Sequence, residues 1–91
     1  MEIEYDEAKR RLTLQKRGLD FADAARVLEG EYIVQDDDRF DYPEPRYQTY
    51  GYLDERLVMF AWTPSDNGMR IISMRKCNER ERQKYERWLG R

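Results

Sequence analysis

The sequence predicts an α+β protein in which two N-terminal helices precede a mostly antiparallel sheet of about four strands, and a last helix follows the sheet. Three observations support this fold class. Apolar residues recur at helical spacing before residue 30, the spacing changes to a period of two between residues 31 and 77, and a helix-capping signal begins at Asn78. At 91 residues, of which 40% are hydrophobic, the chain suits one domain, residues 1–91.

Two helices are expected at the N-terminal end. Asp6 can cap a first helix over residues 7–17, and Gly18 supplies the left-handed stop that often ends a helix. A second helix is predicted over residues 21–29. Its apolar residues at positions i, i+3, i+4 and i+7 would pack as one stripe on the core: Phe21, Ala24, Ala25 and Leu28. The short connection makes the pair a helical hairpin.

The strands follow from alternation and from turn residues. Residues 2–5 can form a short strand or an ordered lead-in to the first helix. The four main strands are predicted over residues 31–35, 46–53, 57–63 and 69–77. The third of these is apolar on both faces, so it should be central, and the polar, proline-containing segment 36–45 should be a loop. The last helix starts after Asn78, with Glu81 at the reciprocal capping-box position.

The charge is distributed unevenly along the chain. The formal net charge is −2, but residues 20–69 carry −8 and residues 70–91 carry +5. A basic end suggests a polyanionic partner, because local potential steers encounter, whereas the acidic middle suggests either solubility or a basic partner. The single cysteine fits a reducing compartment, and no apolar run approaches the length of a membrane span. We therefore expect a soluble, cytoplasmic protein with no membrane partner.

Several kinds of chemistry can be excluded from the residue types. The chain has no histidine, so it has no imidazole base and no imidazole metal ligand. Without a histidine, Cys77 lacks an obvious activating base, and its place at a strand end predicts that it fills the core. The run Asp36–Asp38 could bind a hard cation, but a loop of carboxylates is more often simply solvated. We expect no metal and no other cofactor.

Arginine is the residue type left to carry chemistry. Arg70 and Arg75 flank an apolar strand segment, and Lys76, Arg80 and Arg82 follow. Guanidinium groups bind phosphate through paired hydrogen bonds and stay charged at any working pH, so they can stabilise charge on a phosphorane without a metal. The alternative is an ordinary solvated strand end and charged helix.

The expected faces of the strands refine these candidates. A regular strand would place Arg75 on the same face as Ile71 and Ser73. Alternation places Tyr50 and Tyr52 on one face of their strand, where they could stack single-stranded bases or could simply be half-buried packing residues. The side chains concerned are Arg46, Gln48, Tyr50 and Tyr52. One turn of the first helix is basic and is most simply explained as a solvated face: Lys9, Arg10 and Arg11.

The order of several motifs resembles the BrnT family of ribonuclease toxins from type II toxin–antitoxin pairs, which have a RelE-like fold. The matching segments are YDEAK at 5–9, KRG at 16–18, FADAA at 21–25, RIISMRK at 70–76 and RERQKYE at 80–86. Arg46 also stands where the family commonly has an arginine before a glycine-bearing strand. The chain departs from the family at two positions: Arg17 replaces a usual histidine, and Thr13 replaces a frequent asparagine.

The resemblance implies RNA cleavage without a metal, by attack of the ribose 2′-hydroxyl on the adjacent phosphate. It implies Arg75 as the group that stabilises the phosphorane, with Arg46, Arg82 and Lys9 as further phosphate contacts. Candidates for other RNA contacts are Arg70, Lys76, Arg80, Tyr50 and Tyr52. The implied partner is a BrnA-like ribbon-helix-helix antitoxin, which would bind operator DNA. The alternative is a catalytically inert module that binds only an antitoxin or RNA.

Overall fold

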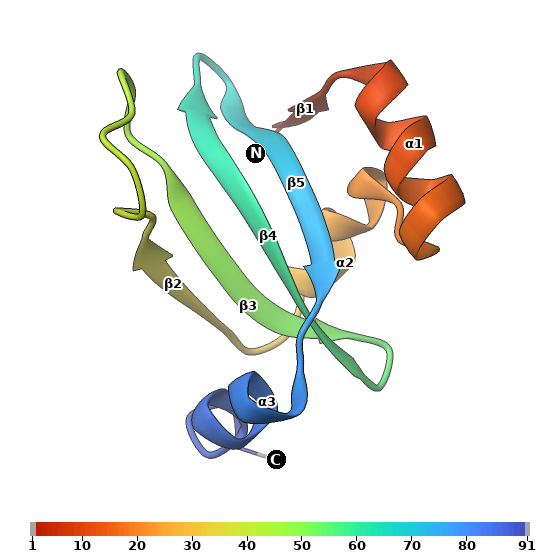
Figure 1. Ribbon diagram of the computed structural model, residues 1–91, viewed down its shortest axis with the longest axis vertical. Coiled ribbons are helices and arrows are strands. Elements are labelled where there is room, and N and C mark those ends of the chain that lie inside the picture. The colour runs from red at the N-terminus through yellow and green to blue at the C-terminus, as the bar shows by residue number, and fades with distance from the viewer. Residues whose placement is uncertain (1, 91) are drawn as a thin grey trace.

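The computed structural model describes residues 2–90 and shows an α+β fold with three α-helices and a five-stranded mixed sheet (Figure 1). The α+β class predicted from the sequence is confirmed. In chain order the elements are β1 (Glu2–Tyr5), α1 (Glu7–Arg17), the 3₁₀ turn η1 (Phe21–Asp23), α2 (Ala24–Val27), β2 (Tyr32–Asp36), β3 (Tyr47–Leu53), β4 (Arg56–Ser65), β5 (Gly68–Lys76) and α3 (Glu79–Glu86).

The sheet has the strand order β1-β5-β4-β3-β2. Strands β2 to β5 form an antiparallel meander, and β4 is central, as its two apolar faces predict. The prediction of about four strands is short by one, because residues 2–5 form β1, which pairs in parallel with β5. The sequence could not assign this pairing, since the two partners lie at opposite ends of the chain.

The predicted second helix over residues 21–29 is wrong in its extent. The segment divides into η1 and the four-residue α2, and its buried side chains are Phe21, Ala24 and Val27, whereas Ala25 is exposed. A spacing of three residues fits the 3₁₀ turn, which has three residues per turn, rather than the 3.6-residue period assumed from the sequence. The Asp20 carboxylate starts the turn by accepting a hydrogen bond from the Ala22 N–H at 2.9 Å.

The sheet has two differently covered faces. Figure 1 shows α2 behind the sheet and α3 in front of one end of it. The α2 side is an apolar core that includes Phe21, Val27, Phe60, Ile71 and Met74. The α3 side includes Tyr50, Leu57, Met59, Cys77 and Tyr85. Cys77 is therefore a buried core residue, as its position at a strand end predicts.

A β-bulge in β5 changes which residues share a face. Neighbouring residues of β4 pair with Ser73 and Ile71, so Ile72 is an extra residue on β5. Because side chains alternate along a strand, one inserted residue moves every later side chain to the other face. Ile71 and Met74 both reach the α2-side core, and Arg75 faces α3. The expectation that Arg75 shares a face with Ile71 is thus wrong, although it does share one with Ser73.

Helix α1 lies at the edge of the sheet, where β1 pairs only with the first part of β5. Its predicted ends are confirmed: Asp6 accepts from the Lys9 N–H, and Gly18 adopts a left-handed conformation with φ 69°. The helix buries none of its side chains, and Leu12 and Leu14 are exposed. No helix within residues 2–90 is long and apolar enough to cross a membrane.

Candidate functional site

The α3-facing surface of the sheet is only partly covered. Helix α3 lies over one end of it, and no other helix within the described residues crosses the remainder (Figure 1). Alternation along the strands places three arginines on this side: Arg75 in the row under α3, Arg70 opposite Thr63, and Arg46 just before β3. The uncovered part therefore combines sheet-borne cations with the rigidity of central strands.

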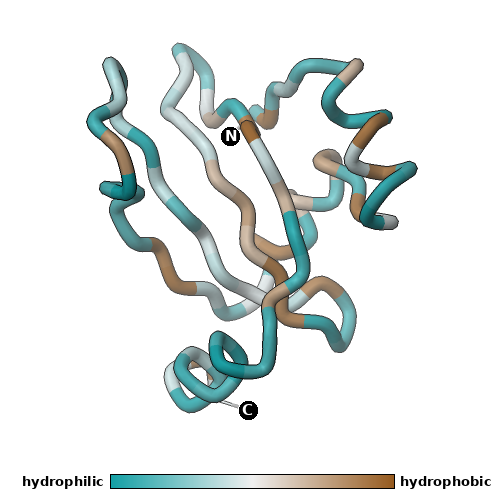
Figure 2. The backbone as a smooth tube through the Cα atoms, viewed as in Figure 1, coloured by the Kyte–Doolittle hydropathy of each residue, from teal (hydrophilic) through white to brown (hydrophobic). Residues whose placement is uncertain are grey.

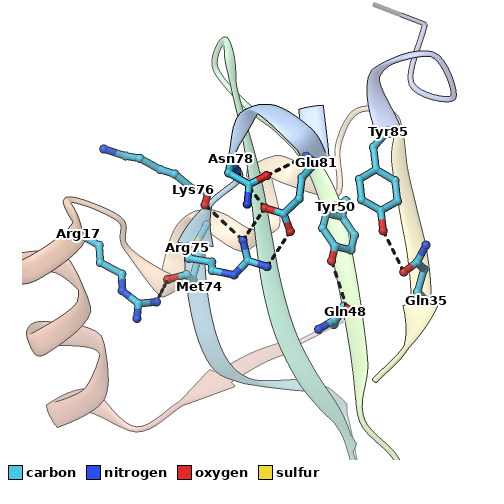
Figure 3. Close-up of polar contacts among 10 residues, drawn as sticks. All are labelled: Arg17, Gln35, Gln48, Tyr50, Met74, Arg75, Lys76, Asn78, Glu81 and Tyr85. Carbon is cyan, nitrogen blue, oxygen red and sulfur yellow. Dashed lines mark hydrogen bonds and ion pairs between the residues drawn. The ribbon is translucent and has the colours of Figure 1, made fainter. Parts of the chain in front are cut away.

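Arg75 forms a bidentate ion pair on this face. Its two terminal nitrogens donate to the two carboxylate oxygens of Glu81 on α3, each at 2.8 Å (Figure 3). Glu81 is fixed in turn by the predicted capping box: it accepts from the Asn78 N–H, and its own N–H donates to Asn78 Oδ1, both at 2.9 Å. The Arg75 guanidinium lowers the pKa of Glu81, so the carboxylate stays ionised. Strand β5 and helix α3 together hold this guanidinium.

One edge of the Arg75 guanidinium is left for a ligand. The hydrogen bonds to Glu81, and a longer one from Nη1 to the Lys76 carbonyl at 3.4 Å, use Nη1 and one side of Nη2. Within residues 2–90, Nε makes no hydrogen bond, and Nε and Nη2 form the second fork of the guanidinium. Such a fork matches two oxygens of a phosphate group.

A row of polar and aromatic side chains continues from Arg75 across the sheet. The Tyr50 ring stacks on Tyr85 with centroids 4.2 Å apart, and its hydroxyl donates to Gln48 Oε1 at 3.2 Å (Figure 3). Tyr50 is only 4% exposed, so its ring offers no surface on which a base could stack. Burial raises the pKa of Tyr50, and burial likewise raises the pKa of Cys77 to about 12. Both groups keep their protons at neutral pH.

Arg46 and Arg70 occupy the uncovered part of this face in different ways. The Arg46 guanidinium lies 3.9 Å over the ring of Tyr42, and its Nε is buried without a hydrogen bond inside the described part of the chain. Arg70 is exposed on β5. Two cations at this end can contact a polyanion that also reaches Arg75.

The acidic loop beside Arg46 is organised by ion pairs. Asp37 is buried, and both of its oxygens accept from Arg39 at 2.8 Å, which lowers the pKa of Asp37. Among residues 2–90, no group of three or more His, Cys, Asp or Glu side chains is arranged to hold a metal ion. The run Asp36–Asp38 thus spans the end of β2 and the start of the following loop, and its residues are not arranged as a metal site.

A basic groove of about 260 Å³ lies between α1 and β5. Its lining residues are Lys9, Leu12, Thr13, Lys16, Arg17, Ile72 and Ser73. Ser73 faces the same side of the sheet as Arg75, so the groove adjoins the arginine-bearing face. Arg17 crosses the groove and donates to the Met74 carbonyl at 2.9 Å (Figure 3). This carbonyl lies on the part of β5 that β1 does not pair with, so Arg17 provides its hydrogen-bond donor. The structure thus brings Lys9 and Arg17 to one wall of the site.

Other residues predicted from the sequence lie elsewhere. Lys76 pairs with Val58 in the register, on the α2 side of the sheet, away from Arg75. Arg82 binds Glu79 and Glu86 along the surface of α3, at 2.9 and 3.2 Å. Arg80 is exposed on the same helix, and Tyr52 packs against the α3-side core.

The sequence does not indicate which partners orient Arg75. Glu81 was recognised only as a capping residue, and its second role depends on how α3 folds back against β5. Gln48 and Ser73 are predicted to share the faces of the candidate residues, but they carry no charge and are not among the predicted site residues. The capping box is the sequence feature that points to this role, because it fixes the position of the Glu81 carboxylate at the start of α3.

Guanidinium groups on the sheet, beside an open surface, are suited to binding the phosphate groups of a polyanion. The fold and the site therefore indicate a phosphate-binding protein. Residues 5–81 match the family model described as ribonuclease toxin, BrnT, of type II toxin-antitoxin system, and the chain belongs to that family. The match includes α1, the open sheet face and both partners of the Arg75–Glu81 ion pair. Membership implies an RNA target and an antitoxin partner. No curated protein matches the chain.

Proposed function

We propose that this protein is an endoribonuclease toxin with a RelE-like fold, and that it cleaves RNA without a metal ion. The observation that carries the proposal is the Arg75 guanidinium, which Glu81 orients while its Nε–Nη2 edge stays available at the sheet face. In the proposed reaction the ribose 2′-oxygen bonds to the adjacent phosphorus and the bond to the 5′-oxygen breaks. The products are a cyclic phosphate and a 5′-hydroxyl.

Arg75 would act on the charge that develops at phosphorus. Its free fork binds two non-bridging oxygens, which gain negative charge in the phosphorane, and a fixed guanidinium stabilises that charge without reorganising. Tyr50 lies in the same row as Arg75, one strand beyond Met59, and keeps its proton. Its hydroxyl, which donates to Gln48 Oε1, would have to leave that acceptor to supply a hydrogen bond or a proton to a reacting oxygen. Glu81 acts as a positioning residue for Arg75.

The other cations would hold the RNA strand on either side of the scissile phosphate. Arg46 and Arg70 extend the phosphate track over the uncovered sheet, and Lys9 extends it along the groove beside α1. Arg80 and Arg82 on α3, and Lys76 behind β5, are placed for outer contacts only. Each such contact should make binding dependent on salt rather than on RNA sequence.

The proposed partner is a ribbon-helix-helix antitoxin of the BrnA kind. It would cover the arginine-bearing face or its rim, stop RNA from entering, and bind operator DNA through its own DNA-binding part. Family membership supports an antitoxin partner in general. A protein that screens exposed arginines is also the simplest means of neutralising a site made of arginines.

One observation favours a second candidate function, that of an inert module which binds an antitoxin or RNA without cleavage. Arg17 stands where the family usually has a histidine, and its guanidinium is engaged by the Met74 carbonyl. A side chain used to close a sheet edge cannot transfer protons as an imidazole would. This candidate predicts RNA binding without products.

One assay separates the two candidates. Protein free of antitoxin is incubated with RNA in the presence of a chelator, alongside Arg75→Ala, Arg46→Ala and Arg11→Ala variants. Arg11 is the matched control, since it is an exposed arginine whose ion pair is with Glu7 of its own helix. We expect cleavage by the unmutated protein and by Arg11→Ala, and a loss of roughly 10²–10³ in rate for Arg75→Ala.

The outcomes bear on different claims. RNA left intact by the unmutated protein would reject the enzyme, and cleavage restored by Arg17→His would then identify a degenerate toxin. Equal rates for Arg75→Ala and Arg11→Ala would reject the site assignment while leaving the activity standing.

A further inference from the structure

A pocket of about 380 Å³ lies between β2 and α3, at the end of the row that starts at Arg75. It is lined by Ile33, Gln35, Lys84, Tyr85 and Trp88. Its volume falls in the range of sites that hold small organic groups. The proposed cleavage chemistry uses none of these five side chains, and the family comparison assigns no role to them.

Trp88 is the unusual member of this set. Its side chain is 73% exposed, whereas the neighbouring Tyr85 and Leu89 are buried. Single exposed apolar side chains are common on protein surfaces, but this indole lines an apolar pocket, so its ring is available to a ligand held there. A flat aromatic surface next to Ile33 suits a flat ligand.

The polar groups of the pocket suit a nucleotide. The Tyr85 hydroxyl donates to Gln35 Oε1 at 3.1 Å, and within residues 2–90 the Gln35 amide nitrogen has no acceptor (Figure 3). That nitrogen can donate to the edge of a base. The Lys84 ammonium lies 5.2 Å from the centre of the Tyr85 ring, at the pocket, where a phosphate of the same nucleotide could be bound.

The pocket and the proposed cleavage site lie at opposite ends of one row of the sheet. Arg75 and Ile33 belong to one row of the register, which passes through Met59 and Tyr50, so their backbones are three strand spacings apart, or about 14 Å. The stacked Tyr50–Tyr85 pair joins the two ends of this row. A single RNA strand with a phosphate at Arg75 can therefore reach the pocket with a base a short distance along the chain.

We propose that this pocket is a base-binding subsite, in which an unpaired RNA base stacks on Trp88 and is contacted at its edge by Gln35. The subsite rests on the proposed function, because it takes its substrate from the cleavage site. It adds a source of selectivity that phosphate contacts at Arg75 cannot supply. Lys84 binds the backbone of the same nucleotide.

Binding is measured separately from cleavage, with a fluorescently labelled 2′-O-methyl RNA oligonucleotide that lacks the attacking hydroxyl. Trp88→Ala should weaken binding roughly 5- to 150-fold, the usual effect of removing one base-stacking aromatic side chain. Trp88→Phe should retain most of the affinity. Val34→Ala is the matched control, since Val34 is exposed on β2 but lies on the other face of the sheet. Trp88 is exposed, so all three variants should unfold at nearly the same temperature as the unmutated protein.

A second probe, an abasic oligomer with the same backbone, tests whether a base is what the pocket recognises. The unmutated protein should bind it more weakly, and Trp88→Ala should not weaken that binding further. Unchanged oligonucleotide binding by Trp88→Ala overturns the proposal. If that variant instead escapes inhibition by the antitoxin, the pocket holds a protein partner, and the proposal is equally overturned. Trp88-dependent binding without any cleavage of natural RNA supports the subsite and rejects the proposed function.

Discussion

The two faces of the sheet differ in what fills them. The α2 side is packed with aliphatic and aromatic side chains such as Phe21, Val27 and Phe60, all almost completely buried. The α3 side interleaves apolar residues with polar ones, among them Tyr50, Gln48 and the Arg75–Glu81 pair. Figure 2 shows the hydrophilic colour of α3 against the apolar centre of the sheet. The α2 side is built for stability, whereas the α3 side combines packing with a polar surface.

This difference separates stability from function in the same strands. Phe60 and Met59 are neighbours on β4, yet one faces the apolar core and the other lies in the row between Arg75 and Tyr50. Substitutions on the α2 side should therefore change folding free energy and leave RNA contacts intact in the folded fraction. Substitutions of polar side chains on the α3 side should weaken RNA contacts and change the folding free energy less.

The largest effect is expected for Phe60→Ala. Phe60 is completely buried in the α2-side core, so its removal leaves a cavity and should lower the free energy of unfolding by about 3–5 kcal/mol. Gln48→Ala, on the α3 side of β3, is the comparison and should cost far less. Urea unfolding followed by circular dichroism measures both values. Similar losses for the two variants would remove the distinction between the faces.

Gly51→Ala should give the next largest loss. A Cβ at Gly51 would lie 2.6 Å from Val27 Cγ1, so α2 would have to move away from β3. Overpacking of this kind costs typically about 1–3 kcal/mol. Gly30→Ala is the control, because a Cβ there meets nothing within 4 Å. If Gly51→Ala unfolds at the same denaturant concentration as the control, the contact between α2 and the sheet is looser than its geometry indicates.

Much of the fold could be predicted from local signals in the sequence. The caps at Asp6, Gly18 and Asn78 are confirmed, as is the central position of β4, because each depends on residues that are close together in the chain. The parallel pairing of β1 and the bulge at Ile72 were not predictable in this way. Both depend on tertiary packing, which a period-two pattern does not report.

The candidate site was predictable only in part. Arg75 could be selected from its motif, but the bulge that turns it toward α3 and the fork with Glu81 arise from the folded arrangement. The sequence also predicts Arg82 as a phosphate contact and Lys76 as an RNA contact, yet Lys76 lies on the other face and Arg82 binds carboxylates of its own helix. The charges in a sequence show which residues can bind phosphate, but they do not show which of these residues lie close together in the folded protein.

A smaller effect is expected at the start of α3. Asn78→Ala removes the side chain that accepts from the Glu81 N–H, and loss of such a cap costs typically about 1 kcal/mol. Because the same capping box holds Glu81 against Arg75, this variant should also slow RNA cleavage, whereas Gly51→Ala should not slow it per folded molecule. Unfolding curves and cleavage rates, corrected for the folded fraction, test the two effects together. Slowed cleavage by Gly51→Ala and not by Asn78→Ala would contradict the assignment.

The smallest effect concerns the dependence of stability on pH. Arg75 lowers the pKa of Glu81 in the folded state, so this carboxylate stabilises the fold above its unfolded pKa of about 4 and loses that contribution as the pH falls through the lower folded value. Glu81→Gln should therefore be less stable than the unmutated protein at pH 7, by under about 1 kcal/mol for this partly exposed pair, and equally stable near pH 2. Glu79→Gln, at a more exposed position, should show a smaller difference than Glu81→Gln at pH 7. Thermal unfolding across this pH range measures the convergence, and a gap that persists in acid would show that Glu81 acts through packing rather than through its charge.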